Sequence, residues 1–176
     1  KIRFVADRGW GQNIAKEMGL VSCVVGEKKK KKKADIICYN GFCSVHQLFD
    51  VEDIAFYRAK YPDILIATHP ECKVEVCDAS DFVGSTSQII DYVSKLPLEQ
   101  KVAIGTEYNM VKRLRKDNTY VLSSSKPECP TMNETTLEDV YSVLVSIKEK
   151  RYENEITISE DTRKWAYAAL NRMFEL

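Results

Sequence analysis

The feature that most constrains the fold is a regular alternation of short apolar runs with segments of helical spacing. The apolar runs predict strands, and the segments between them predict amphipathic helices. Strands are expected over residues 1–7, 21–25, 35–40, 63–68, 101–106 and 119–124, and helices over 8–20, 50–62, 85–96 and 107–117. Strands that alternate with helices of this length are typical of parallel sheets. The sequence therefore predicts an α/β fold.

The pattern changes after residue 126, where only helical spacing remains. Helices are expected over residues 133–150 and 159–176, the second with Ser159 as its cap and acidic residues in its first turn. This change in pattern predicts a boundary near residue 126.

The charge balance and the apolar pattern argue against a nucleic-acid-binding protein and a membrane protein. Lysine plus arginine equal aspartate plus glutamate at 26 each, so no overall field favours nucleic acid or an anionic membrane. The sequence has no apolar run of about 18 residues and no export signal at its start, so we expect a cytoplasmic protein. The lysines at 28–33 predict an exposed loop, because like charges in a row repel.

Polar side chains follow the predicted strands at their carboxyl ends. His69 follows the strand at 63–68, Thr106 ends the strand at 101–106, and Cys43 follows the strand at 35–40. Parallel α/β folds bind ligands at the carboxyl ends of their strands. We therefore expect these residues at one binding site.

Two short motifs suggest a metal centre. Cys43 and His46 are three residues apart, as are His69 and Cys72, and together they match a Cys2His2 zinc site in ligand type. The His-x-x-Cys order with an intervening proline is unusual for a zinc finger. Cys129 precedes a proline on a loop, which is common in iron–sulfur proteins. The remaining cysteines are expected to be buried structural thiols; they are Cys23, Cys38 and Cys77.

Other side chains favour acid/base chemistry and anion binding. Glu71 lies near His69 at the end of a buried strand, so it is either a general acid/base with a pKa raised by burial or a glutamate in a helix first turn. Ser85 and Thr86 offer hydroxyls and backbone N–H groups to a phosphate or carboxylate, or they only cap the helix.

Five motifs in this order resemble the quinolinate synthase family: GFCSVHQ, HPEC, DFVGSTSQI, GTEYNMVKRL and CPTMNETTLEDV. The resemblance covers the whole chain, which corresponds to the latter, larger part of a full-length member. It implies three pseudo-repeated domains, each with an α/β/α arrangement of three layers, around a 4Fe-4S cluster. Residues 1–41 then end the second domain, 42–126 form the third, and 127–176 are helices that complete the first.

The resemblance also implies roles for individual residues. Cys43 and Cys129 would be two of the cluster's three cysteine ligands. His46 and His69 would face the substrate, and Glu71 would be an acid/base. The substrate-binding residues would be Ser85 and Thr86, which bind an anion, together with His69 and Met132, which lines the cavity near the cluster.

The implied activity condenses iminoaspartate with dihydroxyacetone phosphate to give quinolinate, in NAD biosynthesis, with the cluster as Lewis acid and L-aspartate oxidase as a functional partner. The family's first cluster cysteine and its N-terminal site residues have no counterpart in this sequence. Two alternatives remain at this point. One is a non-catalytic, zinc-stabilised α/β binding module, and the other is a metal-free phosphate-binding module that uses Ser85 and Thr86.

Overall fold

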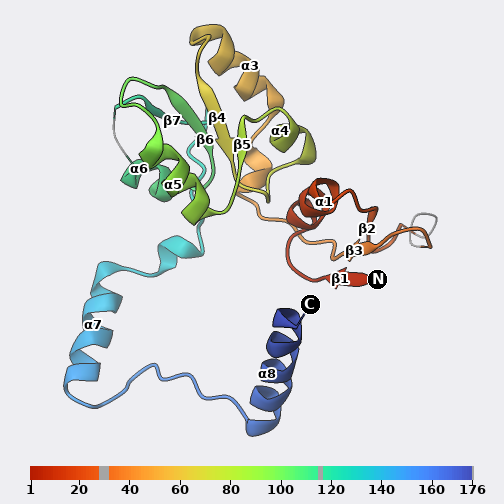
Figure 1. The fold of residues 1–176 in the computed structure, drawn as a ribbon. Coiled ribbons are helices and arrows are strands. Elements are labelled where there is room, and N and C mark those ends of the chain that lie inside the picture. Colours follow the sequence, from red (N-terminus) through yellow and green to blue (C-terminus); the bar gives the residue numbers. More distant parts are fainter. Residues whose placement is uncertain (28–31, 115–116, 176) are drawn as a thin grey trace. The chain divides into compact units, whose positions relative to one another are not determined.

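The computed structural model describes residues 1–27, 32–114 and 117–175. They form two compact units, Lys1–Pro130 and Thr131–Leu176, which we describe separately. The first unit contains two parallel sheets with their helices, and the second consists of helices and connecting segments (Figure 1).

The first sheet of the first unit has three parallel strands in the order β1-β3-β2. Its strands are β1 (Ile2–Phe4), β2 (Ser22–Val24) and β3 (Ile36–Cys38), and α1 (Arg8–Glu17) connects β1 to β2. Helix α1 begins after Asp7, whose carboxylate accepts a hydrogen bond from the Trp10 backbone N–H at 3.1 Å. It ends before Gly19, which has a positive φ of 67° that favours glycine. The packing of Ala15 against this sheet forms a small core.

The second sheet has four parallel strands in the order β5-β4-β6-β7. The strands are β4 (Leu65–Thr68), β5 (Phe82–Val83), β6 (Val102–Gly105) and β7 (Thr119–Val121). The helices are α3 (Val51–Lys60), α4 (Val74–Asp78), α5 (Thr86–Lys95) and α6 (Tyr108–Arg113), with a short 3-10 turn η1 (His46–Leu48) before α3. Figure 1 shows α3 and α4 on one face of this sheet and α5 and α6 on the other.

Alternate residues of the central strands enter two separate cores. In β4, Ile66 packs in the same cluster as Ile54 of α3, whereas Ala67 packs with Ile89 of α5. Successive side chains of a strand point to opposite faces, so a sheet covered on both sides needs apolar residues at both positions. This part of the unit is therefore a three-layer α/β/α structure, and the predicted α/β class is confirmed.

The second unit contains η2 (Met132–Glu134), α7 (Leu137–Lys148) and α8 (Glu160–Phe174). Thr136 and Ser159 cap the two long helices by accepting hydrogen bonds from the backbone N–H groups of Asp139 and Thr162. Ser159 is the cap that the sequence predicts. Within the ranges that the structure describes, no helix combines the length and the apolar character needed to cross a membrane.

Three segments differ in detail from the sequence expectations or lie partly outside the described residues. The two-residue strand β5 lies in a segment that the sequence pattern marks only as a connection, since so short a strand carries no periodic signal. Helix α6 ends at Arg113, before the expected end at 117, and residues 115–116 lie outside the described ranges. Of the predicted lysine loop, residues 28–31 are also outside them, while Lys32 and Lys33 are exposed.

The central strand β6 should dominate the stability of the first unit. Ile104 is fully buried in it, so Ile104→Ala should lower the free energy of unfolding by about 2–5 kcal/mol. Ile2→Ala is the matched control in the edge strand β1, where the side chain is 50% exposed, and should cost about 1 kcal/mol or less. Urea unfolding followed by circular dichroism measures both; equal losses would contradict this account of the core.

Candidate functional site

The strand register brings several polar residues to one edge of the second sheet. Thr68 of β4 pairs with Gly105 of β6 and with Val83 of β5, so the residues that follow these positions leave the sheet side by side. The His69 backbone N–H donates a hydrogen bond to the Gly105 carbonyl at 3.1 Å. The carboxyl edge of the sheet is thus the place where the predicted site residues can meet.

A carboxylate and two imidazoles meet at this edge. The Glu71 Oε2 atom lies 2.9 Å from His46 Nδ1 and 3.9 Å from His69 Nδ1. The two histidine rings stack, with 4.5 Å between their centroids and 19° between their planes. Three residues that the sequence predicts as catalytic therefore form one cluster, although His46 is distant from the other two along the chain.

Each ring nitrogen of His46 lies close to one polar neighbour. It begins η1 and is buried, and its Nε2 lies 3.2 Å from the hydroxyl of Thr106, which is also buried and directly follows β6. The buried Nδ1 contacts Glu71 without the alignment of a full hydrogen bond. The imidazole therefore has one defined partner in the protein and one nitrogen directed at the carboxylate.

The pKa of Glu71 differs from the sequence expectation. The contact with His46 lowers the pKa of the Glu71 carboxyl, and this outweighs the burial that would raise it. The expectation of a pKa raised by burial is wrong, because the two imidazoles supply partners that the sequence could not place. Glu71 also lies in a turn before α4, so it is not in a helix first turn. It is an ionised carboxylate at neutral pH, suited to accept a proton.

His69 is neutral at physiological pH. Burial and the neighbouring His46 lower the pKa of His69 to about 4. Its Nδ1 accepts a hydrogen bond from the Glu71 backbone N–H at 3.3 Å, which places the ring proton on Nε2. A neutral ring that carries a proton on Nε2 can donate a hydrogen bond to a substrate oxygen.

Cys43 lies beside this cluster. Its sulfur, a nitrogen of His46 and a carboxylate oxygen of Glu71 all lie within 4.8 Å of one another, which is close enough to share a cation. The Cys43 backbone N–H donates a hydrogen bond to the Asp7 carboxylate at 2.7 Å, so the residue that caps α1 also holds this loop. Burial raises the pKa of the half-buried Cys43 thiol, so a positive group is needed to stabilise its thiolate.

Comparison with known proteins identifies the family. The family model described as "Quinolinate synthetase A protein" matches residues 1–175. The chain belongs to this family. Curated relatives named quinolinate synthase include one from Helicobacter pylori strain HPAG1, 53% identical over 100% of this chain and 54% of that protein. Those from Acidobacterium capsulatum and Streptomyces coelicolor are each 35% identical over 100% of this chain, covering 52% and 49% of their own lengths.

The chain therefore spans about half the length of the curated relatives it matches. The family identity agrees with the α/β fold. The family resemblance implies an iron–sulfur cluster, which cysteine thiolates would hold.

The thiols of this quinolinate synthase family member divide into two groups. Cys43 and Cys129 are half-buried, and both pack against the core that contains Phe49 and Leu122. The other free cysteines are buried; they are Cys23, Cys38, Cys72 and Cys77. Iron–sulfur clusters are held by cysteine thiolates at the edge of a protected cavity, so Cys43 and Cys129 fit two ligand positions.

The structure does not bring together the Cys2His2 set that the two sequence motifs match in ligand type. Cys72 is fully buried, and its thiol faces the Gly105 carbonyl at 3.5 Å. Among the residues that the structure describes, the group with ligand atoms close enough for one ion contains Cys43, His46 and Glu71 instead. Burial raises the pKa of Cys72 well above its usual range, which also disfavours its thiolate.

The remaining predicted residues have different surroundings. Ser85 is the N-cap of α5, and its hydroxyl accepts a hydrogen bond from the Gln88 backbone N–H at 3.4 Å. Thr86 is exposed in the first turn of α5, which follows β5 at the same edge of the sheet as His69. Met132 begins η2 in the second unit, where its side chain is 64% exposed, and it is described only within that unit.

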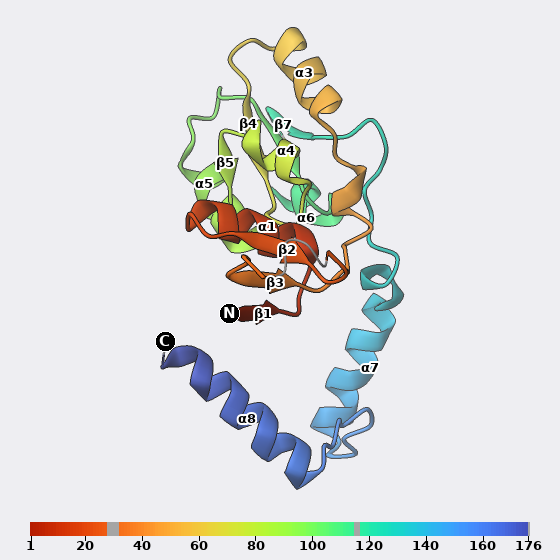
Figure 2. The ribbon, with the colours of Figure 1, turned by 90° about the vertical axis from the view of Figure 1, so that its right-hand side faces the viewer.

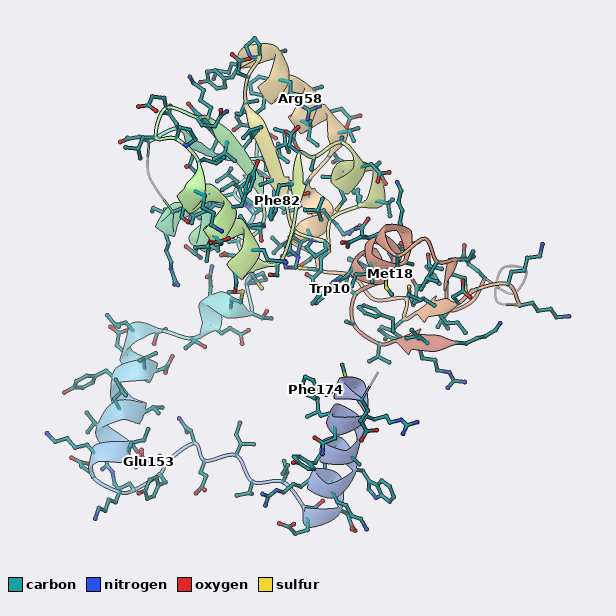
Figure 3. All side chains as sticks on the ribbon, in the orientation of Figure 1. Trp10, Met18, Arg58, Phe82, Glu153 and Phe174 are labelled. Carbon is teal, nitrogen blue, oxygen red and sulfur yellow. The ribbon has the colours of Figure 1, made fainter. Side chains whose placement is uncertain are left out.

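Sequence reasoning missed the residues that support the cluster. Asp7 caps α1 and Trp10 lies within it. Asp7 contacts Cys43 and Trp10 contacts His69, and both pairs are far apart in the sequence. Trp10, labelled in Figure 3, has its ring centroid 6.1 Å from that of His69 in an edge-on contact. The one sequence signal for Asp7 was its position as an aspartate directly before a helix.

The lowered pKa of His69 predicts a specific pH dependence of stability. In the unfolded state the imidazole takes up a proton near pH 6.5, whereas in the folded state it does so only at about 4. The unfolded state binds more protons between these values, so stability falls as the pH is lowered through this window. Urea unfolding of the metal-free chain should show this fall between pH about 6.5 and about 5, and His69→Gln should reduce it. An unchanged slope in the variant would contradict the assignment.

Proposed function

We propose that this chain is the C-terminal part of a quinolinate synthase that condenses iminoaspartate with dihydroxyacetone phosphate. The observation that carries the proposal is the cluster of Glu71, His46 and His69 beside the half-buried thiol of Cys43. This arrangement offers a base, two imidazoles and a soft metal ligand on one sheet edge, as the reaction requires. The family match supports the same activity.

Cys43 and Cys129 would hold a 4Fe-4S cluster, with a third thiolate supplied by the rest of a full-length enzyme. When bound, a cluster with one iron free of protein ligands supplies a Lewis acid that polarises a substrate oxygen and assists the loss of water. The position of both thiols against one apolar core supports this role, since that core shields one side of the cluster from water.

Glu71 would act as the general base of the condensation. Its lowered pKa keeps it ionised, and His46 stabilises the carboxylate before a proton arrives. His69 would donate a hydrogen bond from Nε2 to a substrate oxygen, because its Nδ1 is already occupied by the Glu71 N–H. Thr106 would keep His46 in the orientation that these steps need.

The anionic groups of the substrates would bind at the start of α5. Ser85 and Gln88 form a capping box that satisfies two backbone donors, and the Thr86 hydroxyl remains exposed beside them. The positive end of a helix favours a phosphate or carboxylate at such a position. Met132 would be a further substrate-binding residue, as the family resemblance implies.

The wider assignment follows from the same proposal. The enzyme would be a transferase of NAD biosynthesis in the cytoplasm, with L-aspartate oxidase as the partner that supplies iminoaspartate. Residues 1–41 would complete a second domain, 42–126 would form a third domain, and 127–176 would return to the first. The separate sheets of the first unit support the division near residue 41.

A zinc-stabilised binding module is the second candidate. The ligand atoms of Cys43, His46 and Glu71 lie within 4.8 Å of one another, which suits a zinc ion. This candidate gives no role to Cys129. The two proposals therefore differ in the metal bound and in the effect of replacing that cysteine.

Glu71→Gln tests the catalytic assignment. In a full-length enzyme that contains this chain, the variant should lose at least about 100-fold in kcat, because the amide cannot accept the proton. The iron content should stay at the wild-type level, since no cluster ligand is lost. The rate of quinolinate formation under anaerobic conditions measures kcat, and iron analysis measures the iron content. Turnover at the wild-type rate would remove Glu71 from the mechanism.

Replacement of single cysteines tests the ligand assignment. Cys43→Ala and Cys129→Ala in the full-length enzyme should each lose most of the bound iron and all turnover. Cys23→Ala is the matched control, since Cys23 is a buried thiol in β2 of the first sheet, and should retain both. Zinc in place of iron, retained after Cys129→Ala and lost after Cys43→Ala, would favour the zinc-stabilised module instead.

A further inference from the structure

Helix α1 contacts the turn that carries Glu71. The side-chain amide nitrogen of Asn13 donates hydrogen bonds to the Pro70 carbonyl at 2.8 Å and to the Cys72 carbonyl at 3.0 Å. These two carbonyls belong to the residues directly before and after Glu71. The same nitrogen lies 3.2 Å from the Cys77 sulfur, at the end of α4. One side chain of α1 therefore holds the backbone on both sides of the carboxylate.

Gly9, one helical turn before Asn13, brings the backbone of α1 against the same turn. A Cβ atom at Gly9 would lie 2.8 Å from the Glu71 carbonyl oxygen and 3.1 Å from that of Cys72. Only glycine allows this approach without displacing the backbone. The close contact is independent of the Asn13 hydrogen bonds and shows that α1 packs directly on the catalytic turn.

The turn is also held by contacts of its own and by weak contacts of the Cys72 and Cys77 thiols with nearby carbonyls. The Cys72 backbone N–H closes it by donating to the His69 carbonyl at 3.0 Å, and the Glu71 N–H donates to a histidine ring nitrogen at 3.3 Å. The helix that follows, α4, has only five residues. Figure 2 shows α1 between the first sheet and α4, where it can brace this segment. Helix α1 therefore supplies the Asn13 hydrogen bonds to the backbone on either side of Glu71.

We propose that Asn13 of α1 is a positioning residue that sets the place of the Glu71 carboxylate. This inference rests on the proposed function, in which Glu71 is the base. Loss of the carboxamide leaves two carbonyls of a partly buried turn without their donor, so the turn relaxes. A displacement of about 1 Å at a catalytic group can cost on the order of 100-fold in rate.

Kinetics of variants in the full-length enzyme test the proposal. Asn13→Ala and the isosteric Asn13→Asp, which lacks both N–H donors, should lower kcat about 10- to 100-fold while KM changes less than about twofold. Iron content should stay unchanged. Lys16→Ala is the matched control, because Lys16 also joins α1 to the α4 region through its ion pair with Asp78, yet it does not contact the turn. The control should keep wild-type kcat.

A coupling test separates positioning from general loss of structure. If Asn13 acts through Glu71, then Asn13→Ala should have less than about a threefold effect in a Glu71→Asp background, where the carboxylate is already displaced. Independent effects that multiply would overturn the positioning role. Wild-type kcat in Asn13→Ala, with Glu71→Gln inactive, would overturn it while leaving the proposed function intact.

Hydrogen exchange supplies a readout that does not depend on turnover. In Asn13→Ala, exchange in segment 69–73 should become at least about tenfold faster, while segment 102–105 in β6 stays protected. Equal acceleration in both segments would mean global destabilisation, and no acceleration in 69–73 would mean that Asn13 does not hold the turn. Either result overturns the inference whether or not the enzyme makes quinolinate.

Discussion

The parallel register between β4 and β6 is the constraint on which the rest of the site depends. The pairing of Thr68 with Gly105 places His69 beside Thr106, and the Glu71 turn starts from that point. A shift of one residue would reverse the faces of β4 and would move Ile66 and Ala67 into the wrong cores. The burial of both faces of the sheet thus fixes the register, and the register fixes the site.

Two groups of the site have pKa values below their usual range. The Glu71 carboxylate faces two imidazoles, and its pKa is lowered because His46 compensates for the cost of burial. The His69 ring stacks against His46 and is neutral at physiological pH, because its pKa is lowered. The lowered pKa of Glu71 and the lowered pKa of His69 together give the cluster one negative carboxylate and one neutral ring at neutral pH. This division assigns a proton acceptor and a hydrogen-bond donor to neighbouring residues.

Sequence reasoning found those parts of the molecule that depend on local pattern. The alternation of strands and helices, the caps Ser85 and Ser159, and the residues at strand ends all follow from periodicity and position. The support from Asp7 and Asn13 could not be predicted, since both act on residues more than 30 positions away. The predicted direction of the Glu71 pKa shift was wrong for the same reason. The shift depends on the contact with His46, which the sequence does not give.

The central claim is that the strand ends of this chain form part of an iron–sulfur site. Anaerobic iron and sulfide analysis, with the visible spectrum, of a reconstituted full-length enzyme tests it most directly. The account predicts about four iron and four sulfide per protein and a broad absorption band near ~400 nm. Stoichiometric zinc with neither iron nor sulfide would contradict it and would identify Cys43, His46 and Glu71 as a zinc site.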